Sequence, residues 1–263
     1  NNRASRLLYK ALFFSGEYGT ENVQSLRYDT QKRGGNKTMT REEIAGLACE
    51  ELEKIYPDID CTLTYKKPYE LLFGARLAAQ CTDARVNVVT KTLYVKYPDL
   101  QAFADADLAE LEQDVKPCGF YHTKAKSIKE MARKLLDDFG GEVPGTMEEL
   151  LSLPGVGRKT ANLIMGDVFK KPAIVTDTHC IRISGRLGLT DHKEPAKVEK
   201  DLLKVIPPEI SSHFCHQTVQ FGRDICRARS PKCGECPLSY FCQYHLHPEI
   251  KAPQRKGDKN EKR

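Results

Sequence analysis

Apolar residues recur at helical spacing along almost the whole chain between residues 39 and 247. The clearest stripes run over residues 44–55, 128–139 and 198–206. Apolar positions three and four residues apart lie on one face of a helix, whereas a half-buried strand alternates every second residue. Such alternation is nearly absent, and residues 173–175 form the only short candidate for a strand. Proline and glycine punctuate the stripes, so the sequence predicts an all-α fold.

The first predicted helix begins at a clear signal. Thr40 precedes the stripe and Glu43 follows three residues later, which is the pattern of a capping box. The first methionine, Met39, stands directly before it, and residues 1–38 show no lasting periodicity. We therefore predict that the natural protein starts at Met39, with 1–38 a disordered or non-native extension. The alternative is a basic arm that binds DNA.

Composition is that of a soluble globular protein, with 40% hydrophobic and 29% charged residues among 263. No apolar run approaches the roughly 18 residues of a membrane span, and the N-terminus lacks a signal-peptide pattern. The net charge of +5 comes from the ends. Residues 1–38 carry seven basic and three acidic groups, residues 248–263 carry six and three, and the region between carries −2. Global charge thus indicates no partner, and 248–263 is predicted to be a disordered basic tail.

The most informative segment is Leu-Pro-Gly-Val-Gly at residues 153–157, between two helical stretches. Gly155 and Gly157 permit positive φ and a close approach to the backbone, and Val156 can fill the gap between the helices. The second glycine opens a helix, whose free amide groups and dipole suit a phosphate oxygen. A plain turn between two helices is the alternative interpretation.

Lys159 lies on the first turn of the helix that follows this turn. A lysine there is ordinarily a solvated surface residue. Beside a phosphate-binding turn, the amine can instead attack C1′ of a deoxyribose when it is neutral. Partial burial and the positive end of a helix both favour the neutral form of a lysine. Such an attack expels the base and leaves a Schiff base, which permits strand nicking by β-elimination.

Asp177 stands where the apolar residues 174–175 give way to a further helix. Aspartate is a preferred N-cap, which is the structural interpretation of this residue. A carboxylate here can also stabilise positive charge that develops on a sugar, assist proton transfer, or help to deprotonate Lys159. The two roles are compatible.

Four of the ten cysteines are clustered with the spacing C-x6-C-x2-C-x5-C. They are Cys226, Cys233, Cys236 and Cys242. Four thiolates hold either a tetrahedral zinc ion or an iron–sulfur cluster, and the spacing alone leaves both open. The other six cysteines are scattered through apolar, helical contexts, which indicates small core residues in a reducing cytosol.

Together these motifs resemble the endonuclease III family of the helix-hairpin-helix glycosylase superfamily. The resemblance covers residues 39–247 and rests on Leu-Pro-Gly-Val-Gly-Arg-Lys-Thr-Ala-Asn, a following Asp-Thr-His, and the cysteine spacing. It implies that Lys159 is the nucleophile, that Asp177 assists it, and that the four cysteines hold a [4Fe–4S] cluster. Lys159 argues against the adenine-glycosylase branch, which lacks this lysine. Thr176 departs from the more usual valine.

The resemblance also implies a set of DNA contacts. They comprise the hairpin, two arginines of the cysteine loop, and two side chains that fill the gap left by a flipped base: Gly155, Val156, Gly157, Arg158, Arg227, Arg229, Gln80 and Phe120. The wedge at position 120 is often leucine. The alternatives are a core role for Phe120, a helix-surface position for Gln80 and a solvated charged loop for the arginines.

We therefore expect two helical domains that flank a DNA-binding cleft, with Lys159 and Asp177 facing each other across it. Residues 61–172 are predicted as a six-helix domain, and 39–60 with 173–247 as an iron–sulfur domain. The expected function is excision of oxidised pyrimidines from double-stranded DNA and nicking of abasic sites. The alternatives are a glycosylase for another lesion and a non-catalytic DNA-binding module. We expect a monomer in a bacterial cytoplasm, associated with the nucleoid through DNA.

Overall fold

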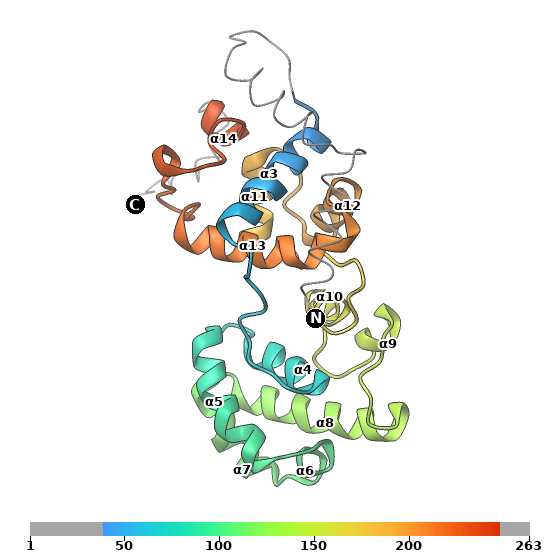
Figure 1. The fold of residues 1–263 in the computed structure, drawn as a ribbon. Coiled ribbons are helices and arrows are strands. Elements are labelled where there is room, and N and C mark those ends of the chain that lie inside the picture. The colour runs from blue at the N-terminus through green and yellow to red at the C-terminus, as the bar shows by residue number, and fades with distance from the viewer. Residues whose placement is uncertain (1–38, 248–263) are drawn as a thin grey trace, which may run out of the picture. The chain divides into compact units, whose positions relative to one another are not determined.

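The computed structural model describes residues 39–247, and the predictions for 1–38 and 248–263 lie outside this range. Every regular element within the described range is helical, which confirms the predicted all-α class (Figure 1). None of these helices is both long enough and apolar enough to cross a membrane.

The chain divides into two compact units. The hairpin unit consists of Ile59–Val175 and Pro208–His216. The cysteine unit consists of the described residues up to Asp58, of Thr176–Pro207, and of the described residues from Gln217 onward.

The hairpin unit contains most of the helices. In chain order they are α4 (Pro68–Leu77), α5 (Asp83–Lys96), α6 (Leu100–Asp105), α7 (Leu108–Val115), the 3-10 turn η1 (Lys116–Cys118), α8 (Tyr121–Phe139), α9 (Met147–Leu151) and α10 (Arg158–Asp167). The long helix α8 packs against α6 and α7 (Figure 1). Ile128, Met131 and Leu135 of its predicted stripe are fully buried in the core of this unit, and Leu136 and Phe139 at the end of the stripe pack partly buried against that core.

The cysteine unit is built on the first described helix, α3 (Arg41–Ile55), together with α11 (Thr178–Leu187), α12 (Pro195–Val205), the 3-10 turn η3 (Cys233–Glu235) and α14 (Gln243–Leu246). The predicted capping box is confirmed, because the Thr40 hydroxyl accepts from the Glu43 amide and the Glu43 carboxylate accepts from the Thr40 amide. Gln217 donates to Glu53 at 3.0 Å. This bond ties α3 to α13 (Ser211–Asp224), a helix that begins in the hairpin unit.

Residues 173–175 form no strand. Instead, side chains of the hairpin unit satisfy the backbone of this buried segment. Asn162 donates to the Ile174 carbonyl at 3.0 Å, the Ala173 amide donates to the Ser211 hydroxyl at 3.0 Å, and the Val175 amide donates to the Cys215 sulfur at 3.2 Å. Buried backbone groups need such partners, and these side chains take the place of a sheet ladder.

The start of α13 is held against α10 by one buried carboxylate. Asp167 accepts from the Ser212 hydroxyl at 2.7 Å and contacts Nε2 of His216 at 2.9 Å. These contacts explain why 208–216 belongs to the hairpin unit, although the sequence analysis assigned it to the other domain. Burial by itself would raise the pKa of Asp167, but the bonds from His216 and Ser212 outweigh it and the pKa is lowered.

We predict that Asp167→Asn lowers the free energy of unfolding by about 1–3 kcal/mol at neutral pH, because it weakens buried hydrogen bonds. Since the pKa of Asp167 is lowered on folding, its contribution is complete above the unfolded pKa of about 3.9. That contribution is lost as the pH falls through the lower folded value. Urea denaturation of both proteins at a series of pH values measures the difference.

The matched control is Asp138→Asn, which removes an exposed carboxylate that pairs with Lys134 on the same helix. Exposed pairs contribute little, so its effect on stability is expected to be small. If the difference in unfolding free energy between wild type and Asp167→Asn stayed constant down to acid pH, it would contradict a lowered pKa of Asp167 in the folded protein.

Candidate functional site

The turn between α9 and α10 depends on Gly155. Its φ is 77°, in the left-handed region that favours glycine. A Cβ atom there would lie 2.8 Å from Nε of Arg76 and 3.1 Å from Cβ of Ser127. Val156 is buried, as predicted for a side chain that fills the gap between the helices. The turn is therefore fixed from inside the hairpin unit.

Gly157 differs from Gly155. Its φ of −105° and ψ of 174° are extended backbone that any residue adopts, so this glycine does not use the positive φ that its lack of a side chain permits. A Cβ atom there would meet nothing within 4 Å. The residue is the N-cap of α10 and provides no side-chain cap. Because no cap covers them, the first amide groups of α10 present the positive end of the helix to an incoming anion.

Arg158 and Lys159 are exposed on this first turn of α10. The position of Lys159 beside the uncapped helix end agrees with the sequence analysis. The partial burial expected for its side chain is not found, since the residue is exposed. In this turn a cationic side chain and several helix amides share one exposed surface of the hairpin unit.

Asp177 is the N-cap of α11 in the cysteine unit, which confirms the structural interpretation. One carboxylate oxygen accepts from the His179 amide at 2.9 Å and from the Cys180 amide at 2.7 Å. The other lies 3.0 Å from Nδ1 of His179. Donors from the helix end favour the ionised form of a carboxylate. Asp177 is thus positioned by the first turn of its own helix, with 14% of its side chain exposed.

Three exposed non-glycine residues of the hairpin unit have left-handed backbones: Gln80, Phe120 and Lys170. Gln80 follows α4 with φ 56°, and Phe120 precedes α8 with φ 49°. Each such conformation costs a non-glycine residue about 1–3 kcal/mol and persists where the surrounding structure enforces it. Phe120 is 65% exposed, so the core interpretation is wrong, and Gln80 lies in a loop and not on a helix surface.

The sequence analysis did not single out Lys124, which is 1% exposed. Its position four residues before Ile128 places it on the apolar face of α8. The sequence signal that could have identified Lys124 is a lysine at helical spacing from the apolar residues of α8.

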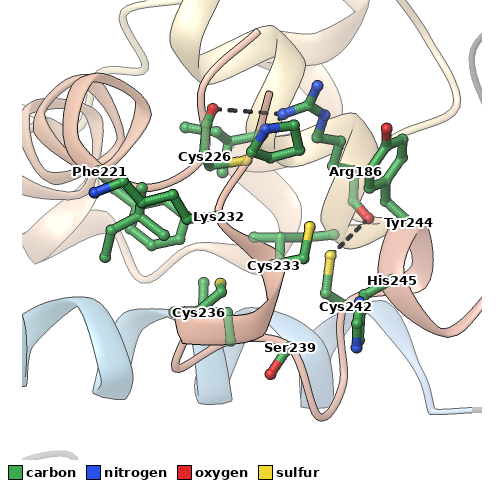
Figure 2. A pocket seen from close by; sticks show the side chains of 15 residues that line it. Arg186, Phe221, Cys226, Lys232, Cys233, Cys236, Ser239, Cys242, Tyr244 and His245 are labelled. Carbon is green, nitrogen blue, oxygen red and sulfur yellow. Dashed lines mark hydrogen bonds between the residues drawn. The ribbon is translucent and has the colours of Figure 1, made fainter. Parts of the chain in front are cut away.

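The four clustered cysteines line one pocket of the cysteine unit (Figure 2). Arg186 of α11 organises the wall of this pocket. Its guanidinium donates to Sγ of Cys226 at 3.2 Å and to the Arg227 and Ala228 carbonyls at 2.8 Å, and its own carbonyl accepts from Cys242 at 3.4 Å. Arg227 and Arg229 are exposed on the loop that these bonds hold.

The chemistry of the pocket fits a metal cluster. Burial, with a smaller contribution from the three other clustered cysteines, raises the pKa of Cys236 to about 11. Four thiolates in one pocket therefore need a compensating positive charge, which bound iron provides. Within residues 39–247 no three His, Cys, Asp or Glu side chains converge as a single-ion site, and the sulfur atoms instead surround a space.

Comparison with known families identifies two matching regions. Residues 74–208 match the HhH-GPD superfamily of base excision DNA repair proteins. Residues 226–242 match the iron–sulfur binding domain of endonuclease III, and this segment includes all four clustered cysteines.

Individual relatives agree with this. The endonuclease III of Synechocystis sp. is 47% identical over 192 residues, which span 73% of this chain and 88% of that protein. The enzyme of Bacillus subtilis is 44% identical over 195 residues, 74% of this chain and 89% of that protein. Two solved structures, a non-covalent endonuclease III–DNA complex and a trapped endonuclease III–DNA covalent intermediate, match with TM-scores of 0.75 and 0.74 at 43% identity. They cover 81% and 80% of this chain, and 100% and 99% of their own.

The two glycines of the turn should respond oppositely to substitution by alanine. Gly155→Ala is expected to lower the free energy of unfolding by more than about 1 kcal/mol, because it combines a left-handed backbone with a clash against Arg76. Gly157→Ala, the matched control, is expected to change it by less than about 0.5 kcal/mol. Chemical denaturation of the two variants tests this, and equal losses would contradict the distinction.

Proposed function

Because this chain belongs to the endonuclease III family of base excision DNA repair proteins, we propose that it excises oxidised pyrimidines from double-stranded DNA and nicks the abasic site. It is a DNA glycosylase with a [4Fe–4S] cluster. The observation that carries the proposal is the exposed Lys159 at the uncapped start of α10. We further propose that it acts as a monomer, in a bacterial cytoplasm at the nucleoid.

The hairpin grips the DNA backbone. The amide groups that Gly157 leaves uncapped donate to a phosphate oxygen, and Arg158 adds charge beside them. The open space around Gly157 supports this role, because nothing inside the protein requires a glycine there. A methyl group at 157 would stand where the phosphate approaches. Such contacts position the protein without reading the base sequence.

Lys159 then performs the covalent step. Its neutral amine forms a bond to C1′ of the flipped nucleotide, and the glycosidic bond breaks as the base leaves with the bonding electrons and takes up a proton. Ring opening gives a Schiff base between Nζ and C1′. Loss of a proton from C2′ then breaks the bond to the 3′ oxygen, so the same lysine that excises the base also nicks the strand.

Asp177 supplies negative charge to this reaction. Its carboxylate stabilises the positive charge that develops on the sugar as the glycosidic bond breaks, and it accepts a proton from the lysine. The two helix amides that hold one carboxylate oxygen fix its orientation. Capping and catalysis are therefore compatible in one residue.

Gln80 and Phe120 act while the base is outside the stack. Their exposed side chains and fixed left-handed backbones suit insertion into the gap that the flipped nucleotide leaves. Phe120 offers a larger stacking surface than the leucine usual at this position.

Cys226, Cys233, Cys236 and Cys242 hold the [4Fe–4S] cluster. Bound there, the cluster cross-links a segment with little regular structure of its own, and its role is structural. Arg186 supports the same loop through its bonds to Cys226, Arg227 and Ala228. Arg227 and Arg229 are thereby presented to the DNA backbone.

Borohydride trapping on a duplex that carries thymine glycol tests the proposal. Wild type is expected to form a covalent adduct, because borohydride reduces the Schiff base, and Lys159→Ala is expected to form none while it still binds the duplex. The control is Lys170→Ala, which removes another exposed lysine just beyond the end of α10. An adduct with Lys159→Ala would show that Lys159 is not the nucleophile. Binding without an adduct in wild type would indicate another lesion or a non-catalytic module.

Two substitutions separate the roles of Asp177. Asp177→Asn keeps a capping oxygen, so its stability is expected within about 0.5 kcal/mol of wild type, whereas Asp177→Ala is expected to lose about 1 kcal/mol. Both are expected to lower the rate of base excision by at least about 10²-fold, because both remove the charge. Thermal denaturation and single-turnover excision measure the two effects. A wild-type rate of excision by Asp177→Asn would show that Asp177 only caps α11 and takes no part in the reaction.

A further inference from the structure

The ammonium group of Lys124 is buried in the hairpin unit, where it joins two separate loops. Nζ donates to the Leu77 carbonyl at 2.9 Å and to the Cys118 carbonyl at 2.8 Å. Leu77 ends α4, and Cys118 ends η1. One side chain of α8 thus holds the ends of two neighbouring elements.

These two carbonyls lie just before Gln80 and Phe120, which are two of the three exposed non-glycine residues with left-handed backbones in the described chain. Gln80 follows Leu77 by three residues, and Phe120 follows Cys118 by two. The main chain of Lys124 adds a third link, since its amide donates to the Phe120 carbonyl at 3.1 Å. Strained backbone persists where its surroundings determine it, and Lys124 contacts the surroundings of both residues.

The placement of this lysine is costly. Burial lowers the pKa of Lys124, and the neighbouring thiols of Cys118 and Cys81 oppose the shift, while Arg76 adds to it. The side-chain hydrogen bonds of the ammonium go to main-chain carbonyls. An apolar side chain would suit this position on the buried face of α8, so core packing alone does not account for a lysine.

We propose that Lys124 is a positioning residue that locks the Gln80 and Phe120 loops together, so that both side chains enter the DNA stack as one rigid wedge. The inference rests on the proposed function, because it assigns the rigidity of these loops to the base-flipping step. Lys124 itself touches no substrate. Its effect reaches DNA through the two loops.

The chain offers a matched control on the same helix. Lys129 also donates to a loop carbonyl, that of Ala106, but this loop carries no left-handed non-glycine residue. Lys124→Met removes two hydrogen bonds from a lysine to the main chain, and Lys129→Met removes one. Lys124→Arg keeps donors for both carbonyls, and Lys124→Gln is a second neutral variant for use if the methionine variant does not fold.

Two measurements separate positioning from general stability. The first uses a duplex with a tetrahydrofuran abasic analogue opposite 2-aminopurine, whose fluorescence rises when wedge insertion unstacks it without any reaction. The second compares the rate of borohydride-trapped adduct formation on a thymine-glycol duplex with the rate on a single-stranded abasic oligonucleotide, which needs no wedge.

For Lys124→Met we expect most of the fluorescence change to be lost and the duplex rate to fall about 10²-fold, with the single-stranded rate within about threefold of wild type. Lys124→Arg should recover most of the duplex rate, and Lys129→Met should match wild type throughout. Equal losses on both substrates, or wild-type behaviour of Lys124→Met, would overturn the inference. If wild type forms no adduct on any substrate, the proposed chemistry fails, and a fluorescence change that still depends on Lys124 would leave the positioning role standing.

Discussion

Hydrogen bonds from helix side chains to loop main chain are the interactions on which the rest of this structure depends. The described fold is all helical, so its functional residues lie in loops or at helix ends, where no sheet ladder satisfies the backbone. Lys124 bonds the loops of Gln80 and Phe120, and Arg186 bonds the carbonyls of the cysteine loop. Because each of these donors lies on a helix, the hydrogen bonds hold the loops in fixed positions relative to the helices. A rigid scaffold of this kind is what a covalent reaction at one sugar carbon requires.

Two helix ends show how the same backbone feature serves opposite purposes. The first amides of α10 have no side-chain cap and remain available to an anion from outside the protein. The first amides of α11 are capped by Asp177, so they hold a carboxylate inside the protein. The positive end of a helix stabilises negative charge in either case. In the proposed mechanism the first helix therefore binds a phosphate beside the nucleophile, and the second fixes the charge that assists it.

Sequence reasoning succeeded where the signal was local. Stripes and caps located the helices, with Thr40 and Asp177 as N-caps, because a helix is specified by residues three and four positions apart. It failed where distant residues decide the outcome. The irregular path of residues 173–175 and the buried place of Lys124 both follow from contacts between separate elements. The family motifs assigned chemistry to residues, while only the structure identified what holds them in place.

Energetic costs gather on the part of the hairpin unit that is proposed to meet DNA. Gln80 and Phe120 have strained backbones, Lys124 is a buried cation, and Nε of Arg76 beneath Gly155 is buried without a hydrogen-bond partner in the described part of the chain. A fold selected only for stability would relieve these features with small or apolar side chains. These unfavourable features are explained if folding, and not DNA binding, supplies the free energy that orders the loops. In the proposed mechanism, loops that are already rigid lose less conformational entropy when the base leaves the stack, so more of the contact energy remains to hold the flipped nucleotide beside Lys159.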